Sequence, residues 1–111
     1  MNRIKLIGFA ALLAVPVLCS AETWKDVALV DNNCAEKAKA DPDAHTKDCA
    51  IKCSSSGYAI VSSDGTVLKL DATGNKDAIA ALNAYGKPDH LRVTVSGDRD
   101  GETIKVKSLK M

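Results

Sequence analysis

Aromatic residues are scarce in this chain, making up 4% of its 111 residues, whereas charged residues make up 26%. Neither sign of charge dominates, since 15 Lys and Arg residues stand against 14 Asp and Glu residues. Single-stranded nucleic acids are held by aromatic stacking in a positively charged groove, and anionic surfaces attract an excess of positive charge. The composition therefore argues against a nucleic acid or an anionic membrane as partner.

Several catalytic signatures are also missing. The sequence has no nucleophile elbow of the Ser-His-Asp hydrolases, no Gly-rich phosphate loop and no Cys-x-x-Cys motif. Asp98 and Asp100 flank Arg99 but lack the further oxygen ligands of a calcium loop. We therefore expect a protein that is not an enzyme and that needs no cofactor.

One short apolar run lies near the N-terminus. It spans residues 6–18 and follows the basic residues Arg3 and Lys5. A bilayer-spanning helix needs about 20 apolar residues, so the run is too short for a stable membrane anchor. A positive start followed by such a run is typical of a secretory signal peptide. We expect residues 1–21 to be that peptide.

The expected cleavage site lies between Ala21 and Glu22, because Ala21 and Cys19 supply small residues at the −1 and −3 positions. Lipidation at Cys19 is the alternative, but Leu18 is larger than the residue that usually precedes a lipidated cysteine. Cleavage leaves 13 basic residues (15 − 2) against 14 acidic ones, a net charge of −1. We expect a periplasmic or secreted protein with no stable membrane insertion after cleavage.

Residues 22–111 suffice for one small domain with one hydrophobic core. Asp41-Pro42 is typical of a helix start, Gly57 of a helix end, and Asp64-Gly65 of a two-residue hairpin turn. The patterning predicts strands at 23–30, 58–62, 66–71, 91–96 and 104–107, with helices at 41–55 and 75–85 and a turn at 97–101.

The predicted fold is mainly β with two helices. The order is strand, helix, hairpin, helix, hairpin. Five short antiparallel strands with open edges would risk aggregation, and closure into a barrel removes those edges. We therefore expect a small five-stranded OB-like barrel, with an open α+β sandwich as the alternative.

The three cysteines after the signal peptide and one histidine form a distinctive pattern. His45, Cys49 and Cys53 are spaced four residues apart, which places them on one face of a helix, and Cys34 lies upstream. Exported proteins meet oxidising conditions. We therefore expect a disulfide between Cys34 and either Cys49 or Cys53, worth about 3 kcal/mol in the chain-entropy model.

Two other interpretations of these residues stay open. Thiolates and imidazole are suitable ligands for zinc or copper, so Cys34, His45, Cys49 and Cys53 are a candidate metal set. The third cysteine is instead a candidate reactive thiol in redox chemistry. His45, on the exposed side of the predicted helix, is expected to be solvated unless it serves one of these roles.

The sequence resembles a family of small exported bacterial proteins of unknown function. The resemblance is carried by the run 31–35, the pattern His45-x3-Cys49-Ala50-x2-Cys53, and the segments 57–61, 64–67, 93–97 and 101–106. It implies an OB-like domain in the bacterial envelope and no particular activity. After Cys34 this chain has Ala35-Glu36-Lys37, whereas relatives often carry Gly or His.

The function expected from the sequence is that of an exported, non-enzymatic envelope module. It would bind or stabilise another envelope protein or a small ligand. The alternatives are a metal-binding protein that uses the cysteines and His45, and a small thiol-redox protein.

Overall fold

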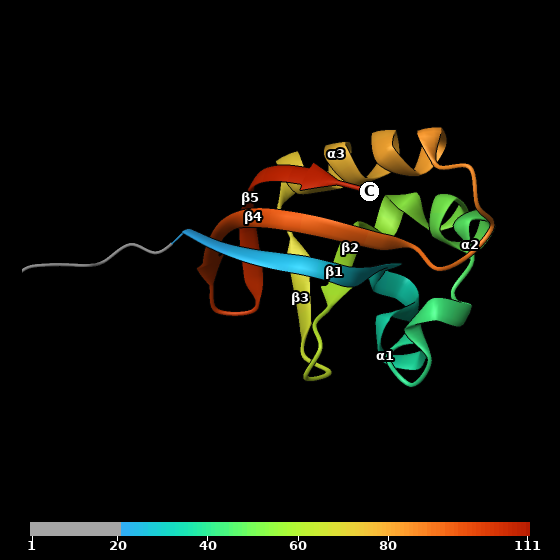
Figure 1. The fold of residues 1–111 in the computed structure, drawn as a ribbon, viewed down its shortest axis with the longest axis horizontal. Coiled ribbons are helices and arrows are strands. Elements are labelled where there is room, and N and C mark those ends of the chain that lie inside the picture. The colour runs from blue at the N-terminus through green and yellow to red at the C-terminus, as the bar shows by residue number, and fades with distance from the viewer. Residues whose placement is uncertain (1–20) are drawn as a thin grey trace, which may run out of the picture.

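Five strands close into a barrel in the computed structural model, which describes residues 21–111 (Figure 1). Their order around the barrel is β1-β2-β3-β5-β4. This confirms the predicted five-stranded OB-like barrel, and the open sandwich is wrong. The expected signal peptide falls almost wholly outside the described residues. The strands are β1 (Ala21–Asp31), β2 (Tyr58–Val61), β3 (Val67–Leu70), β4 (Arg92–Asp100) and β5 (Thr103–Lys110).

The barrel closes through one parallel pair. β3 and β5 run in the same direction, with Lys69 opposite Thr103, whereas the other four pairs are antiparallel. The expectation of an all-antiparallel sheet is therefore wrong. The reason is topological. Two antiparallel pairings lead from β1 to β3 through β2, and two lead from β1 to β5 through β4, so β3 and β5 both run in the direction of β1.

The inward faces of the strands form the hydrophobic core. Helix α3 (Ala72–Ala84) connects β3 to β4 (Figure 1). Its residues Ala78 and Leu82 are completely buried in this core. The Asp71 side chain accepts a hydrogen bond from Gly74 N and so begins this helix three residues before the predicted start. Within residues 21–111, no helix is both long and apolar enough to cross a membrane.

The connection between β1 and β2 holds several short helices instead of the single helix predicted for 41–55. His45 has an extended backbone (φ −69°, ψ 131°) and interrupts that helix. The next helix has Thr46 as its N-cap residue, and the Thr46 hydroxyl accepts a hydrogen bond from Cys49 N. The Asp41 side chain makes no capping hydrogen bond to the turn that follows it. The elements are the 3-10 turns η2 (Asn32–Cys34), η3 (Pro42–Ala44) and η4 (Ser54–Ser56) and the helices α1 (Ala35–Ala38) and α2 (Lys47–Lys52).

Two irregularities bend the long strands. The register of β1 against β4 shifts between Trp24 and Val27, around Asp26 with its positive φ of 52°. β4 continues through the predicted turn at 97–101, and Gly97 lies at a second register shift, against β5. The chain reverses only at Gly101, where φ is 64°. Gly97 therefore allows β4 and β5 to approach each other closely and does not form a turn.

Candidate functional site

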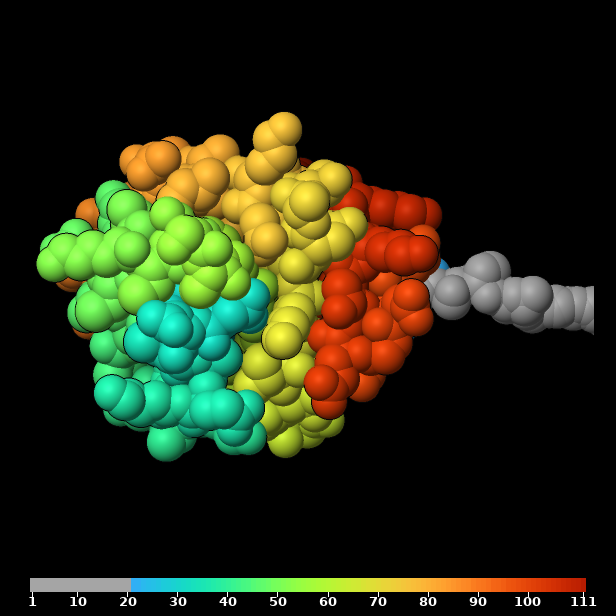
Figure 2. All heavy atoms as spheres, turned by 180° about the vertical axis from the view of Figure 1, so that it is seen from behind, coloured from blue at the N-terminus to red at the C-terminus, as the bar shows by residue number. Residues whose placement is uncertain are grey.

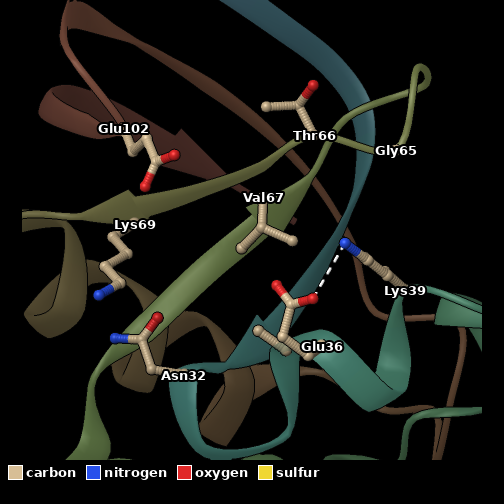
Figure 3. A pocket seen from close by; sticks show the side chains of 9 residues that line it. Asn32, Glu36, Lys39, Gly65, Thr66, Val67, Lys69 and Glu102 are labelled. Carbon is tan, nitrogen blue, oxygen red and sulfur yellow. Dashed lines mark ion pairs between the residues drawn. The ribbon is translucent and has the colours of Figure 1, made fainter.

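A groove of about 460 Å³ lies on the outer face of β3 (Figure 3). We call it the barrel groove. Its floor is strand β3 with the hairpin turn before it, one wall is the β1–β2 connection, and Glu102 in the β4–β5 turn stands opposite. It is lined by Asn32, Ala35, Glu36, Lys39, Gly65, Thr66, Val67, Lys69 and Glu102.

Small side chains bring helix α1 close to the barrel. A second apolar cluster on the outer face of β1 and β2 consists mainly of alanines, with Val67 packed against it. Because alanines let two elements approach closely, α1 lies beside β3 and forms the groove wall (Figure 2). The face of strands 2 and 3, between the first and last loops, is where OB-folds bind ligands. The barrel groove occupies that place.

The floor of the groove contains a free strand edge. In an antiparallel pair, successive residues direct their backbone groups alternately toward and away from the partner. Ser62 N donates to Thr66 O within the β2–β3 hairpin, whereas Lys69 N donates away from β2, to Glu102 O. Val67 therefore directs its N–H and C=O away from β2, and pairing with β5 begins only at Lys69. Within residues 21–111, no backbone hydrogen bond satisfies Val67 on that side.

Both signs of charge surround this edge. Lys39 Nζ lies 3.0 Å from Glu36 Oε1 across the α1 wall (Figure 3). Lys69 and Glu102 bring a further cation and anion, and no ion pair engages either of them among the described residues. No aromatic side chain lines the groove. Its chemistry therefore suits a ligand with both charges and a polar backbone.

One polar atom beside the groove is left without a partner. Asn32 Nδ2 donates to Ser56 O over 2.9 Å. Asn32 Oδ1 is buried and, in the part of the chain that the structure describes, accepts no hydrogen bond. A buried acceptor without a donor costs about 1–3 kcal/mol.

A buried Asp–His pair lies at the end of β1, and the sequence pattern did not lead us to predict it. The His45 side chain is 8% exposed, and its Nε2 donates to Asp31 Oδ1 over 2.7 Å; Asp31 itself is fully buried. Asp31 Oδ2 also accepts from Cys34 N. The prediction of a solvated His45 on one helix face with Cys49 and Cys53 is wrong, because His45 precedes the helix and turns inward. The available signal was an aspartate at the end of an apolar strand, directly before a turn that its side chain caps.

The three cysteines lie near this pair, and all three are free in the structure. Cys34, His45 and Cys49 line a second cavity of about 320 Å³. In residues 21–111, no three Cys, His, Asp or Glu side chains converge in a group that could hold a metal ion. The disulfide of Cys34 with Cys49 or Cys53 and the zinc or copper site remain predictions.

The electrostatics around Cys34 do not favour a reactive thiol. Partial burial raises the pKa of Cys34, and the nearby Asp31 carboxylate and Cys53 raise it further. Since the thiolate is the nucleophile, a raised pKa lowers the reactive fraction at neutral pH. Cys34 is therefore better suited to a structural bond than to rapid exchange.

An Arg–Asp clamp fastens the connection to the barrel. Arg92 Nε and Nη2 each donate to the Asp43 carboxylate over 2.9 Å, and Arg92 Nη1 donates to Asp26 O. The hydrogen bonds from Arg92 lower the pKa of Asp43, despite an opposing effect of desolvation. The clamp thus joins β1, β4 and the turn η3.

This clamp predicts a small acid-dependent loss of stability. A lowered folded-state pKa means that the Asp43 carboxylate stabilises the fold above the unfolded pKa, near pH 4, and loses that contribution as the pH falls through the lowered value. The Arg92 and Asp43 side chains are 39% and 34% exposed, so water weakens the interaction between them. We therefore expect Asp43→Asn to cost at most about 1 kcal/mol of folding stability at pH 6. Urea unfolding should show that this cost shrinks as the pH approaches 2. A cost that grows on acidification would contradict the clamp.

The fold and groove together define the class of molecule: a small closed β-barrel with an OB-like strand order and a polar groove on its outer face. No family model, no curated protein and no solved structure matches the chain. The resemblance to small exported bacterial proteins therefore stays an expectation, and the function has to be argued from the site.

Proposed function

We propose that the protein is an exported, non-enzymatic binding module that holds an extended peptide segment of another envelope protein in the barrel groove. The free edge of β3 at Val67 is the observation that carries the proposal. An extended peptide that adds to a sheet edge gains backbone hydrogen bonds regardless of its side chains. Val67 N–H and C=O offer one such pair at the centre of the groove.

The surroundings of Val67 favour a peptide over other polymers. The unpaired Lys69 and Glu102 match a segment that carries an acidic and a basic residue. Nucleic-acid bases need stacking platforms, and the groove lining contains no aromatic residue. The combination of a free strand edge and mixed charge without aromatic residues therefore favours a polypeptide.

Export supports an envelope protein as the source of that peptide. The basic start, the short apolar run and the small residues before Glu22 are typical of a signal peptide. Ala21 and Glu22 begin β1, opposite Asp98 and Gly97 of β4. Cleavage between Ala21 and Glu22 would therefore leave the described barrel intact except for one terminal residue of that strand.

A peptide titration followed by NMR tests the proposal. The protein is produced by export and labelled with nitrogen-15, and the probe is a blocked hexapeptide of valine and threonine with one lysine and one glutamate. We expect saturable shift changes confined to the groove residues, with the largest changes at Thr66, Val67 and Lys69. Lys69→Glu should weaken binding about tenfold, the equivalent of about 1.4 kcal/mol, because it replaces a favourable charge contact with repulsion.

A matched charge reversal outside the groove controls for net charge. Lys76 is exposed on α3, so Lys76→Glu should leave the peptide affinity within twofold of the unmodified protein. Equal losses in the two variants would mean that the peptide responds only to overall charge. Shifts spread over α3, or tighter binding of oligothymidylate or of a chito-oligosaccharide than of the peptide, would contradict the proposal.

A further inference from the structure

We propose that Cys34 and Cys53 form a disulfide that fastens the α1 wall of the barrel groove to the segment after α2, and that Cys49 stays a free thiol. Sequence alone leaves the partner of Cys34 open between Cys49 and Cys53. The pairing is argued from the contacts of the thiols and stands without the proposed function. Only its effect on the groove rests on that function.

Hydrogen bonds already join the two segments that carry Cys34 and Cys53. Asn32 N donates to Gly57 O, Asn32 Nδ2 to Ser56 O and Asn33 N to Ser56 Oγ, over 2.9, 2.9 and 3.2 Å. Turn η2, which ends at Cys34, therefore lies against turn η4, which Cys53 precedes.

The sulfur of Cys53 points toward this junction. Asn33 Nδ2 donates to Cys53 Sγ over 3.8 Å, so the residue directly before Cys34 touches the sulfur itself. The charge of an ionised Cys53 also raises the pKa of Cys34, which requires the two thiols to be near each other. Cys34 and Cys53 are both partly buried, as the two halves of a structural disulfide commonly are.

Cys49 occupies a different position. It is exposed on α2, one helical turn before Cys53, and its backbone N–H is fixed by the cap at Thr46. It lines the second cavity together with Cys34, but the side chain of Asn33, next to Cys34, contacts the sulfur of Cys53 instead. The geometry therefore assigns the bond to Cys53 and leaves Cys49 accessible to solvent.

The bond forms by ordinary thiol–disulfide exchange. Glutathione disulfide, or another disulfide oxidant of the same class, is attacked by one protein thiolate to give a mixed disulfide and one reduced thiol. The second protein thiolate then attacks the mixed disulfide, and a second reduced thiol leaves. Two protein S–H groups lose two protons and two electrons, and the oxidant gains them.

The position of the bond links it to the groove. Helix α1 begins at Ala35, immediately after Cys34, and places Glu36 and its C-cap residue Lys39 in the groove wall. α1 has four residues, too few to be stable as an isolated helix. A covalent bond at Cys34, the N-cap residue of α1, holds the wall in place, and reduction releases it.

Trypsin digestion without reduction tests the pairing directly. Cleavage after lysine places the three cysteines on three different peptides, 26–37, 48–52 and 53–69. After oxidation of the reduced protein by glutathione disulfide, we expect the linked pair 26–37 with 53–69 and an alkylatable thiol on 48–52. Cys49→Ser should oxidise like the unmodified chain, whereas Cys53→Ser should lose that linked pair.

Three outcomes would overturn the pairing. One is a dominant link between peptides 26–37 and 48–52. Another is a protein whose three thiols all stay alkylatable under oxidation. The last is a native protein, isolated without chelator, that retains one zinc or copper ion and no disulfide.

The effect on the groove is measured in the Cys49→Ser variant with the hexapeptide probe. We expect reduction to weaken peptide binding at least fivefold. Unchanged peptide affinity after reduction would contradict the effect of the disulfide on the groove wall, while the pairing of Cys34 with Cys53 would still stand. Absence of peptide binding in both redox states would contradict the proposed function, and the digestion would still decide the pairing.

Discussion

Gly97→Ala is expected to destabilise the protein by about 3 kcal/mol or more, the upper end of the cost of overpacking. A Cβ atom at this position would lie 2.2 Å from the Lys105 carbonyl oxygen and 3.0 Å from Val106 Cα. Both neighbours belong to the backbone of β5, so no side-chain rotation can relieve the contact. β4 and β5 would have to separate where their register shifts, and this pairing helps to close the barrel.

Urea unfolding of both proteins, with Gly86→Ala as the matched control, measures this effect. Gly86 has open space around the position of a Cβ atom and no positive φ. Alanine there should be neutral or stabilise the fold by up to about 1 kcal/mol. Equal unfolding midpoints for the two alanine variants would show that β4 and β5 do not approach as closely as the structure places them.

Asp31→Ala is expected to cost about 3–5 kcal/mol, from about 1–3 kcal/mol for each hydrogen-bond donor that loses its acceptor and from the void that the smaller side chain leaves. Asp31 is fully buried and accepts hydrogen bonds from His45 Nε2 and from Cys34 N. Alanine would leave both donors without an acceptor and a void beside them. Since domains of this size are stable by about 5–15 kcal/mol, the variant should be close to unfolding at 37 °C.

Two comparison variants separate this buried pair from surface effects. Asp31→Asn keeps an acceptor at the same place and should cost less than Asp31→Ala. Asp43→Ala breaks the partly exposed pair with Arg92 and should cost about 1 kcal/mol or less. Thermal unfolding of the three variants gives the order. If Asp43→Ala lowered the stability as much as Asp31→Ala, the buried Asp31 would contribute no more to the fold than a partly exposed ion pair, which would contradict this account.

Much of the barrel could be predicted from local patterns. Asp64-Gly65 correctly located the β2–β3 hairpin, but the predicted two-residue turn is wrong: Ser62 N donates to Thr66 O across the three residues 63–65, and of these only Gly65 has a positive φ. The alternation at 91–96 predicted the buried side chains Val93 and Val95 of β4. These signals are local, because turn chemistry and strand periodicity depend on residues close together in sequence.

The β1–β2 connection could not be predicted in the same way. Asp41-Pro42 has the form of a helix start, yet the chain leaves the helical conformation at His45. What draws His45 inward is Asp31, fourteen positions earlier, through a hydrogen bond that helix propensity cannot reveal. The barrel groove is likewise assembled from three distant segments, because α1, β3 and the β4–β5 turn meet only after the barrel closes.

Hydrogen exchange at the single amide of Val67 tests the central claim, that a peptide adds to the free edge of β3 in the barrel groove. Without ligand, Val67 N–H has no backbone acceptor among the described residues, whereas Leu68 lies opposite Ile60 in β2. With the hexapeptide at saturation, we predict that Val67 exchange slows at least tenfold while Leu68 exchange hardly changes. Unchanged exchange at Val67 in a saturated complex would contradict strand addition, and with it the function proposed for this protein.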